Sequence, residues 1–151
     1  MKMLTRKMLS AVAGLLLLAP GVSLSQTTDE RSFTEGSVVV VSNIRTEPGQ
    51  FDNYLKYLAG TYKSLMEEYK KAGIILDYGV YSTSPTNPSE PDLILTVAYK
   101  NLAAMDNLDA KQDPIGKKIW GSLQASSQAS AERGKMRAQL GSRMLRQLVL
   151  K

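Results

Sequence analysis

The hydrophobic residues of this chain fall into runs separated by polar turns, and the spacing within each run predicts its secondary structure. Valine occupies four consecutive positions, Val38 to Val41, and this density of β-branched residues predicts a first strand over residues 38–45. From Phe51 to Tyr69 the apolar residues recur every three or four positions, which is typical of one face of a helix. We therefore predict a long helix over residues 50–72.

The middle of the chain has the pattern of a β-hairpin. Residues 74–81 and 93–99 are rich in Ile, Leu, Val and Tyr, and each run predicts a strand. Between them, residues 82–91 contain three prolines and several polar residues, which indicates a loop.

The last third of the chain predicts further helices and a final strand. Asn101 is placed to cap a short helix, and Asp113 followed by Pro114 is typical of the start of a longer one. Residues 144–150 predict a fourth strand. The order β-α-β-β-α-β predicts an α+β, ferredoxin-like fold, in which a four-stranded antiparallel sheet carries its helices on one face.

The first three predicted strands carry apolar residues on both of their faces. Helices can cover only one face of such a sheet, and a large apolar surface left in water marks an interaction site. We therefore expect two copies to press their open sheet faces together in a homodimer.

The N-terminus has the pattern of a cleavable signal peptide. Three basic residues precede an apolar run over residues 9–19, and small residues, Ser23 and Ser25, stand at the −3 and −1 positions of a cut before Gln26. The run is shorter than the ~20 residues of a membrane-spanning helix. We expect a signal peptide over 1–25, a flexible leader over 26–36 and a single domain over 37–151. The protein is then periplasmic or secreted, with no membrane anchor after cleavage.

Charge gives no reason to expect a nucleic-acid partner. The chain has 19 basic and 14 acidic residues, and the signal region holds three of the basic ones, so the mature chain is close to neutral. Six basic residues against one acidic residue crowd the last twenty positions. We interpret this segment as the solvated face of a helix, with an anionic partner as the alternative.

The absence of histidine and cysteine excludes several kinds of chemistry. A Ser-His-Asp triad, a cysteine nucleophile, a histidine zinc site and histidine-ligated haem all need residues that this chain lacks. No glycine-rich phosphate loop or calcium-loop spacing is present either. We expect no cofactor and no metal, and acid–base catalysis would rely on Asp, Glu, Lys or Tyr.

The pattern over residues 38–151 resembles the dimeric α/β-barrel superfamily. The features that carry the resemblance are the first strand, the entry into the long helix at residues 47–51 and the hairpin over 74–99. Shorter segments at 65–68, 72–78, 91–93, 132–134 and 140–142 are similar to those of exported bacterial members without an assigned function. The resemblance implies the fold and the dimer. It does not choose among functions, because the superfamily includes cofactor-free monooxygenases, lactone isomerases, haem enzymes and binding proteins.

One polar set on the predicted sheet forms a candidate ligand site. Alternation places Asn43 with Arg45 on one face of the first strand, and Asp77 with Tyr81 on one face of the second, while Thr96 is polar in the third. If all five converge on the open face, they line a cleft for a small apolar or anionic ligand, with Arg45 as the partner of an anionic group. The alternative is structural, with an ion pair between Arg45 and Asp77 that holds the sheet or the dimer.

Three functions fit these observations. The first is an exported, dimeric small-molecule-binding protein of the cell envelope. The second is a cofactor-independent oxygenase or isomerase that acts on an aromatic or lactone compound. The third is an accessory module that binds another protein through its basic C-terminal segment.

Overall fold

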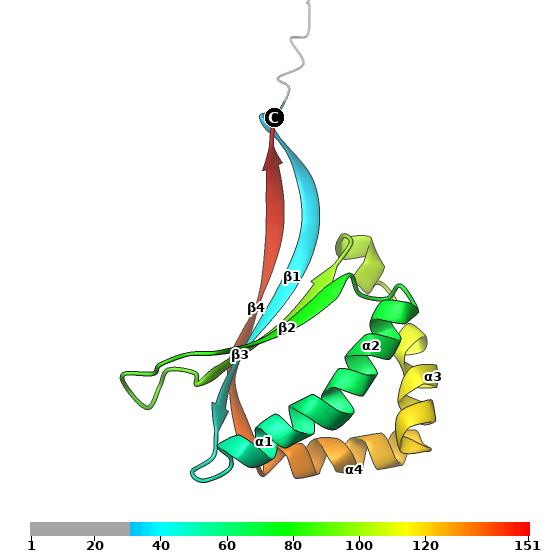
Figure 1. Cartoon of the computed structure of the whole chain (residues 1–151). Coiled ribbons are helices and arrows are strands. Elements are labelled where there is room, and N and C mark those ends of the chain that lie inside the picture. The colour runs from blue at the N-terminus through cyan, green and yellow to red at the C-terminus, as the bar shows by residue number, and fades with distance from the viewer. Residues whose placement is uncertain (1–30) are drawn as a thin grey trace, which may run out of the picture. The chain divides into compact units, whose positions relative to one another are not determined.

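Four strands form one antiparallel sheet in the order β2-β3-β1-β4 (Figure 1). The computed structural model describes residues 31–151, so the expected signal peptide and residues 26–30 of the expected leader lie outside the described residues. This strand order confirms the predicted ferredoxin-like topology. The strands are β1 (Phe33–Thr46), β2 (Asp77–Ser82), β3 (Leu93–Tyr99) and β4 (Arg137–Leu150).

The helices lie on one side of this sheet, as predicted (Figure 1). The predicted long helix is present as one continuous rod, and Asn101 caps a short 3₁₀ turn by accepting a hydrogen bond from the amide of Ala104 at 2.9 Å. The helical segments are α1 (Phe51–Tyr57), the π-helical η1 (Leu58–Tyr62), α2 (Lys63–Lys71), the 3₁₀ turn η2 (Leu102–Met105), α3 (Leu108–Trp120) and α4 (Leu123–Gly134).

The predicted helix that starts at Pro114 is wrong in its boundaries. Helix α3 begins at Leu108, so Pro114 lies inside it, and the single predicted helix is in fact two. Gly121, with φ +79°, ends α3 in the left-handed conformation that glycine adopts most easily. The hydroxyl of Ser122 then accepts a hydrogen bond from the amide of Ala125 at 3.0 Å and starts α4.

Strands β1 and β4 both begin earlier in the chain than the sequence predicts. Strand β1 begins at Phe33, within the expected leader, and β4 begins at Arg137, so the two pair over almost their whole lengths. Three of the six basic C-terminal residues, Arg137, Arg143 and Arg146, therefore lie in β4, and only Arg133 lies in a helix, so the interpretation of this segment as a helix face is wrong. The hydrophobic pattern did not predict where β1 and β4 begin, because main-chain pairing between these strands stabilises polar residues as readily as apolar ones.

Strand β2 is shorter than predicted at its start. It begins at Asp77, whereas Ile74 and Ile75 lie in the preceding turn, where both side chains are buried. These two residues are apolar because they are buried in the turn, and in the sequence they extended the apolar run of the predicted strand.

The core lies between the sheet and the helices, in two clusters. One gathers around Val38, Met66 and Tyr99, the other around Ile44 and Tyr54. Val38, Val40 and Ile44 of β1 all pack in these clusters, so the even-numbered positions of this stretch face the helices. By alternation, the odd-numbered positions from 39 to 45 face the open side.

Candidate functional site

The five residues of the predicted site all lie on the open face of the sheet. Strand register places Asn43 opposite Ile94 and Ile94 opposite Tyr81, so these three form one row across the sheet. Thr96 lies in the next row and Asp77 in the row after that, opposite Ala98. The alternation that grouped these residues in the sequence is therefore correct.

Three of the five residues line a common hollow of about 250 Å³, namely Asp77, Tyr81 and Thr96. The ring of Tyr81 lies across Gly79: a Cβ atom at Gly79 would stand 2.6 Å from ring carbon Cε2 of Tyr81 and 2.9 Å from Oγ1 of Thr96. A larger residue at position 79 would require the Tyr81 ring and the Thr96 hydroxyl to shift.

Arg45 stands apart from this hollow. Its guanidinium donates hydrogen bonds to the carbonyl of Asn87, at 2.8 Å, and to that of Glu90, both in the loop between β2 and β3. Arg45 is six residues along β1 from Val39, the position that shares a row with Asp77, which is about 20 Å along an extended strand. The expected convergence of all five residues, and the alternative ion pair between Arg45 and Asp77, are both wrong.

A second hollow, on the helix side of the sheet, is more apolar. This groove has a volume of about 350 Å³ and lies between edge strand β2 and the rod formed by α1, η1 and α2. Its volume falls at the lower end of the range of small-molecule pockets. The groove is lined by Leu55, Leu58, Ala59, Tyr62, Lys63, Tyr78 and Val80.

The π-helical turn η1 forms one wall of the groove. Core residues of the rod follow one another four positions apart, at Tyr54, Leu58, Tyr62 and Met66. In a regular α-helix each such step drifts by about 40° around the axis, and the wider π turn offsets this drift. The hydroxyl of Ser64 donates to the carbonyl of Gly60 at 3.0 Å, a bond to the residue four positions earlier that often accompanies a bend in a helix. Turns of this kind occur frequently at functional sites.

Two tyrosines meet edge to face in the groove wall. The rings of Tyr62 and Tyr78 have centroids 6.0 Å apart and an interplanar angle of 81°. The hydroxyl oxygen of Tyr62 is buried and has no hydrogen-bond partner among the described residues. Burial raises the pKa of Tyr62 above its ordinary value, and the nearby Tyr54 and Tyr78 add to the shift. This hydroxyl therefore stays protonated at neutral pH.

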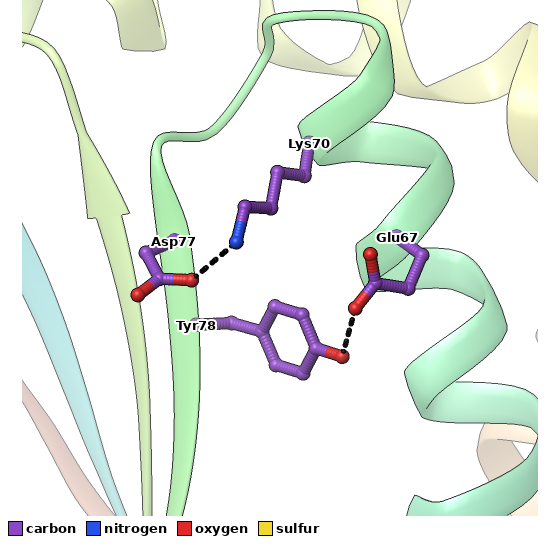
Figure 2. Close-up of polar contacts among 4 residues, drawn as sticks. All are labelled: Glu67, Lys70, Asp77 and Tyr78. Carbon is purple, nitrogen blue, oxygen red and sulfur yellow. Dashed lines mark hydrogen bonds and ion pairs between the residues drawn. The ribbon is translucent and has the colours of Figure 1, made fainter.

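A polar clasp joins β2 to α2 beside the groove (Figure 2). Figure 2 shows the ring of Tyr78 pointing from β2 toward α2, where its hydroxyl donates to Oε1 of Glu67 at 2.7 Å. This hydrogen bond raises the pKa of Tyr78 to about 12. In the same clasp, Nζ of Lys70 lies 2.8 Å from Oδ1 of Asp77 and lowers the pKa of that carboxyl group. The clasp thus holds Tyr78 in place as part of the groove wall.

The groove was not predicted from the sequence. Tyr62 was part of the apolar stripe of the predicted long helix and Tyr78 was part of the predicted second strand, and neither was expected to line a binding site. One signal was present: Ala59 and Gly60 place two small residues in succession in the middle of a helix, where glycine is unfavourable by about 1 kcal/mol relative to alanine. A glycine kept at that cost indicates a local irregularity.

The described residues offer no ready metal site and no membrane span. Within residues 31–151, no group of three acidic side chains is placed to hold a metal ion. None of the helices in that part of the chain has the length and hydropathy to cross a bilayer.

Comparison with known proteins supports the fold. No family model and no curated protein matches the chain. HapK from Hahella chejuensis matches it with a TM-score of 0.51 and 12% identity, over 73% of this chain and 91% of HapK. A protein from Shewanella oneidensis matches with a TM-score of 0.50 and 13% identity, over 78% of this chain and 96% of its own.

A third structure is described as a dimeric ferredoxin-like protein from an uncultured marine organism. Its TM-score is 0.48, with 12% identity over 78% of this chain and 98% of its own. At these identities a likeness concerns the fold alone. The first two likenesses agree with the ferredoxin-like protomer that the resemblance to the dimeric α/β-barrel superfamily implied.

Proposed function

We propose that this protein is an exported homodimer that binds a small, largely apolar molecule in the groove between β2 and the π-helical turn η1. The observation that carries the proposal is the groove itself. Six of its seven lining residues are apolar or aromatic, and the seventh, Lys63, adds one charged group. Binding pockets combine these two properties: an apolar lining and a few polar groups that orient the ligand.

Binding fits this groove better than catalysis does. A tyrosine acts as a general base only when its pKa is brought down toward the working pH. Burial shifts the pKa of Tyr62 in the opposite direction, and the hydroxyl of Tyr78 is committed to Glu67. Lys63 is the only other lining residue that titrates, and no acid lines the groove with it.

The open face of the sheet supports the homodimer. Val39, Val41, Ile94 and Ala98 share that face with Leu145 of β4, whose side chain is half exposed. Beyond the part of β1 that pairs with β3, strands β1 and β4 continue as a two-stranded ribbon away from the helices (Figure 1). A two-stranded ribbon is marginally stable in water by itself. A second copy that covers the open face and the ribbon would bury both.

Export rests on the N-terminal pattern of the sequence. Intact-mass measurement of the protein from the envelope fraction should give a chain that begins near Gln26. Retention of residues 1–25 would contradict both the signal peptide and the expected location.

The ligand site is tested by filling the groove. Ala59 is exposed on η1 and lines the groove, so Ala59→Trp places an indole there. We expect this variant to lose most of its binding of a neutral apolar dye such as Nile red, measured by fluorescence titration. Ala131→Trp, at an exposed position of α4, is the matched control and should bind the dye like the wild type. Equal loss in both variants, or loss in neither, would refute the groove as the site.

The dimer has its own measurement. Light scattering at micromolar concentration should report twice the mass of the mature chain, and the same mass for Ala59→Trp, because the groove lies on the helix side of the sheet. A monomer would mean that no second copy covers the open face.

A further inference from the structure

Two lysines beside the groove have no acidic partner. The four ion pairs among the described residues engage Lys70, Lys118, Lys135 and Arg146. Lys63 lines the groove but takes part in none of them. Lys56 is likewise in none of them. Two positive charges therefore stand unneutralised along the same side of the rod.

A second hollow, which holds the other lysine, shares two lining residues with the groove. This adjoining hollow, of about 390 Å³, is lined by Asp52, Leu55, Lys56 and Ala59. Leu55 and Ala59 line both hollows, which therefore lie next to each other on the rod. Asp52 is the single acid here, and it forms no ion pair with either lysine. The combined surface is apolar at one end and carries a net positive charge at its rim.

We infer that the groove binds a single-chain amphiphile with an anionic headgroup, such as a free fatty acid. The chain lies in the groove between Leu58, Tyr62 and Val80, and the carboxylate is held at the rim by Lys63, with Lys56 adding to the positive potential. This inference rests on the proposed function, because it names the ligand class of the same groove.

The lining of the groove indicates where an anionic headgroup would lie. The apolar part of the groove can receive a hydrocarbon chain but offers no cation for a charge buried inside it. A charged headgroup must therefore remain at the rim, in contact with water, where a lysine ammonium can approach it. An ion pair at such an exposed position contributes about 0.2–1 kcal/mol. The charge of the headgroup therefore discriminates among amphiphiles whose hydrocarbon chains the groove would bind equally well.

The test compares ligands that share one chain and differ in headgroup. Decanoate, decanol and decyltrimethylammonium are titrated against bound Nile red, below their micelle concentrations, with wild type and Lys63→Gln. The measured quantity is the ratio of decanoate affinity to decanol affinity, which removes the contribution of the chain. We expect this ratio to fall by about two- to fivefold in Lys63→Gln, while the affinity for decanol stays unchanged. It should also fall in wild type at high salt.

Lys117→Gln is the matched control. Lys117 is exposed on α3, is in none of the ion pairs and does not line the groove. Its removal should leave the ratio as in wild type. An equal fall in Lys117→Gln would show a general charge effect and overturn the role of Lys63.

The remaining outcomes separate this inference from the proposed function. If decanol displaces the dye but the ratio is unchanged in Lys63→Gln, the anionic headgroup is wrong and the apolar groove stands. A preference for decyltrimethylammonium would assign the rim to Asp52 instead and would also overturn the inference. If none of the three ligands displaces the dye and Ala59→Trp still binds it, the groove itself is not the site.

Discussion

Replacing Tyr62 with phenylalanine removes one oxygen atom from the wall of the groove and leaves the ring in place. That oxygen is buried and has no hydrogen-bond partner among the described residues. In the unfolded chain the same hydroxyl is bonded to water, so folding strips it of hydrogen bonds without replacement. A buried polar group left in this state costs about 1–3 kcal/mol.

We therefore expect Tyr62→Phe to stabilise the ligand-free protein. Taking the lower end of that range, the free energy of unfolding should rise by about 1 kcal/mol. For a domain of this size, such a gain raises Tm by about 4 °C. Urea unfolding, followed by the fluorescence of Trp120 at one fixed protein concentration, measures the change; the concentration is fixed because a dimer's apparent stability depends on it.

Tyr78→Phe is the matched comparison, since it removes the same atom from the neighbouring ring. Its hydroxyl donates to Glu67 at 2.7 Å, so its loss should lower the free energy of unfolding by about 0.5–1 kcal/mol. Opposite signs for the two variants are the signature of one unpartnered and one partnered hydroxyl. A loss of stability in Tyr62→Phe as large as that in Tyr78→Phe would refute the reasoning, because it would mean that the Tyr62 hydroxyl has a partner.

Two further predictions concern Arg45 and the response to acid. Arg45→Ala should speed hydrogen exchange of amides in the loop over residues 83–92 and leave dye binding in the groove intact, because the guanidinium donates to the carbonyls of Asn87 and Glu90. Asn43→Ala, two residues earlier on the same face of β1, is the control and should leave exchange in the loop unchanged. Lost dye binding in Arg45→Ala, with unaltered exchange in the loop, would instead assign Arg45 to a ligand. Acid should destabilise the fold, because Lys70 lowers the pKa of Asp77 and Lys118 lowers that of Glu68. A carboxyl group whose folded pKa is depressed contributes stability above its unfolded pKa of about 4 and loses it as the pH falls through the folded value. The urea midpoint should therefore drop below about pH 4, less steeply in Lys70→Met, and an equal drop in that variant would contradict the contribution of the Lys70–Asp77 pair.

Local pattern was enough to predict most of the fold of this protein. The spacing of apolar residues in the long helix, the apolar run at residues 93–99 and the cap at Asn101 are all found where they were expected. The helix and the cap depend on interactions between residues close together in the chain, and β3 was recognised by its local apolar run although it pairs with β1 and β2. The ferredoxin-like topology then followed from the order of the elements, because few arrangements of that order bury their apolar faces.

Tertiary structure decided the ends of the sheet and the break in the second helical region. Strand β4 acquires its full length from pairing with β1, whose residues lie more than ninety positions earlier in the chain at every pair of the ladder, and hydrophobicity does not indicate that pairing. Pro114 lies inside a helix that begins at Leu108. Local propensity disfavours proline at an interior position of a helix, and the packing of α3 against the core outweighs that preference.

The candidate site divides in the same way. Alternation along one strand was sufficient to place Asp77 with Tyr81 on a common face, because side chains in a strand have a period of two, whereas the position of Thr96 beside them came from the pairing of β2 with β3. The distance between Arg45 and Asp77 depended on the register between strands, which no single strand specifies. The groove depended on a helix and an edge strand that meet only in the folded chain. Whether Tyr62 belongs to the core or to the wall of a groove is set by how far Leu55, Ala59 and Val80 stand from one another across that contact, and such a distance exists only in three dimensions.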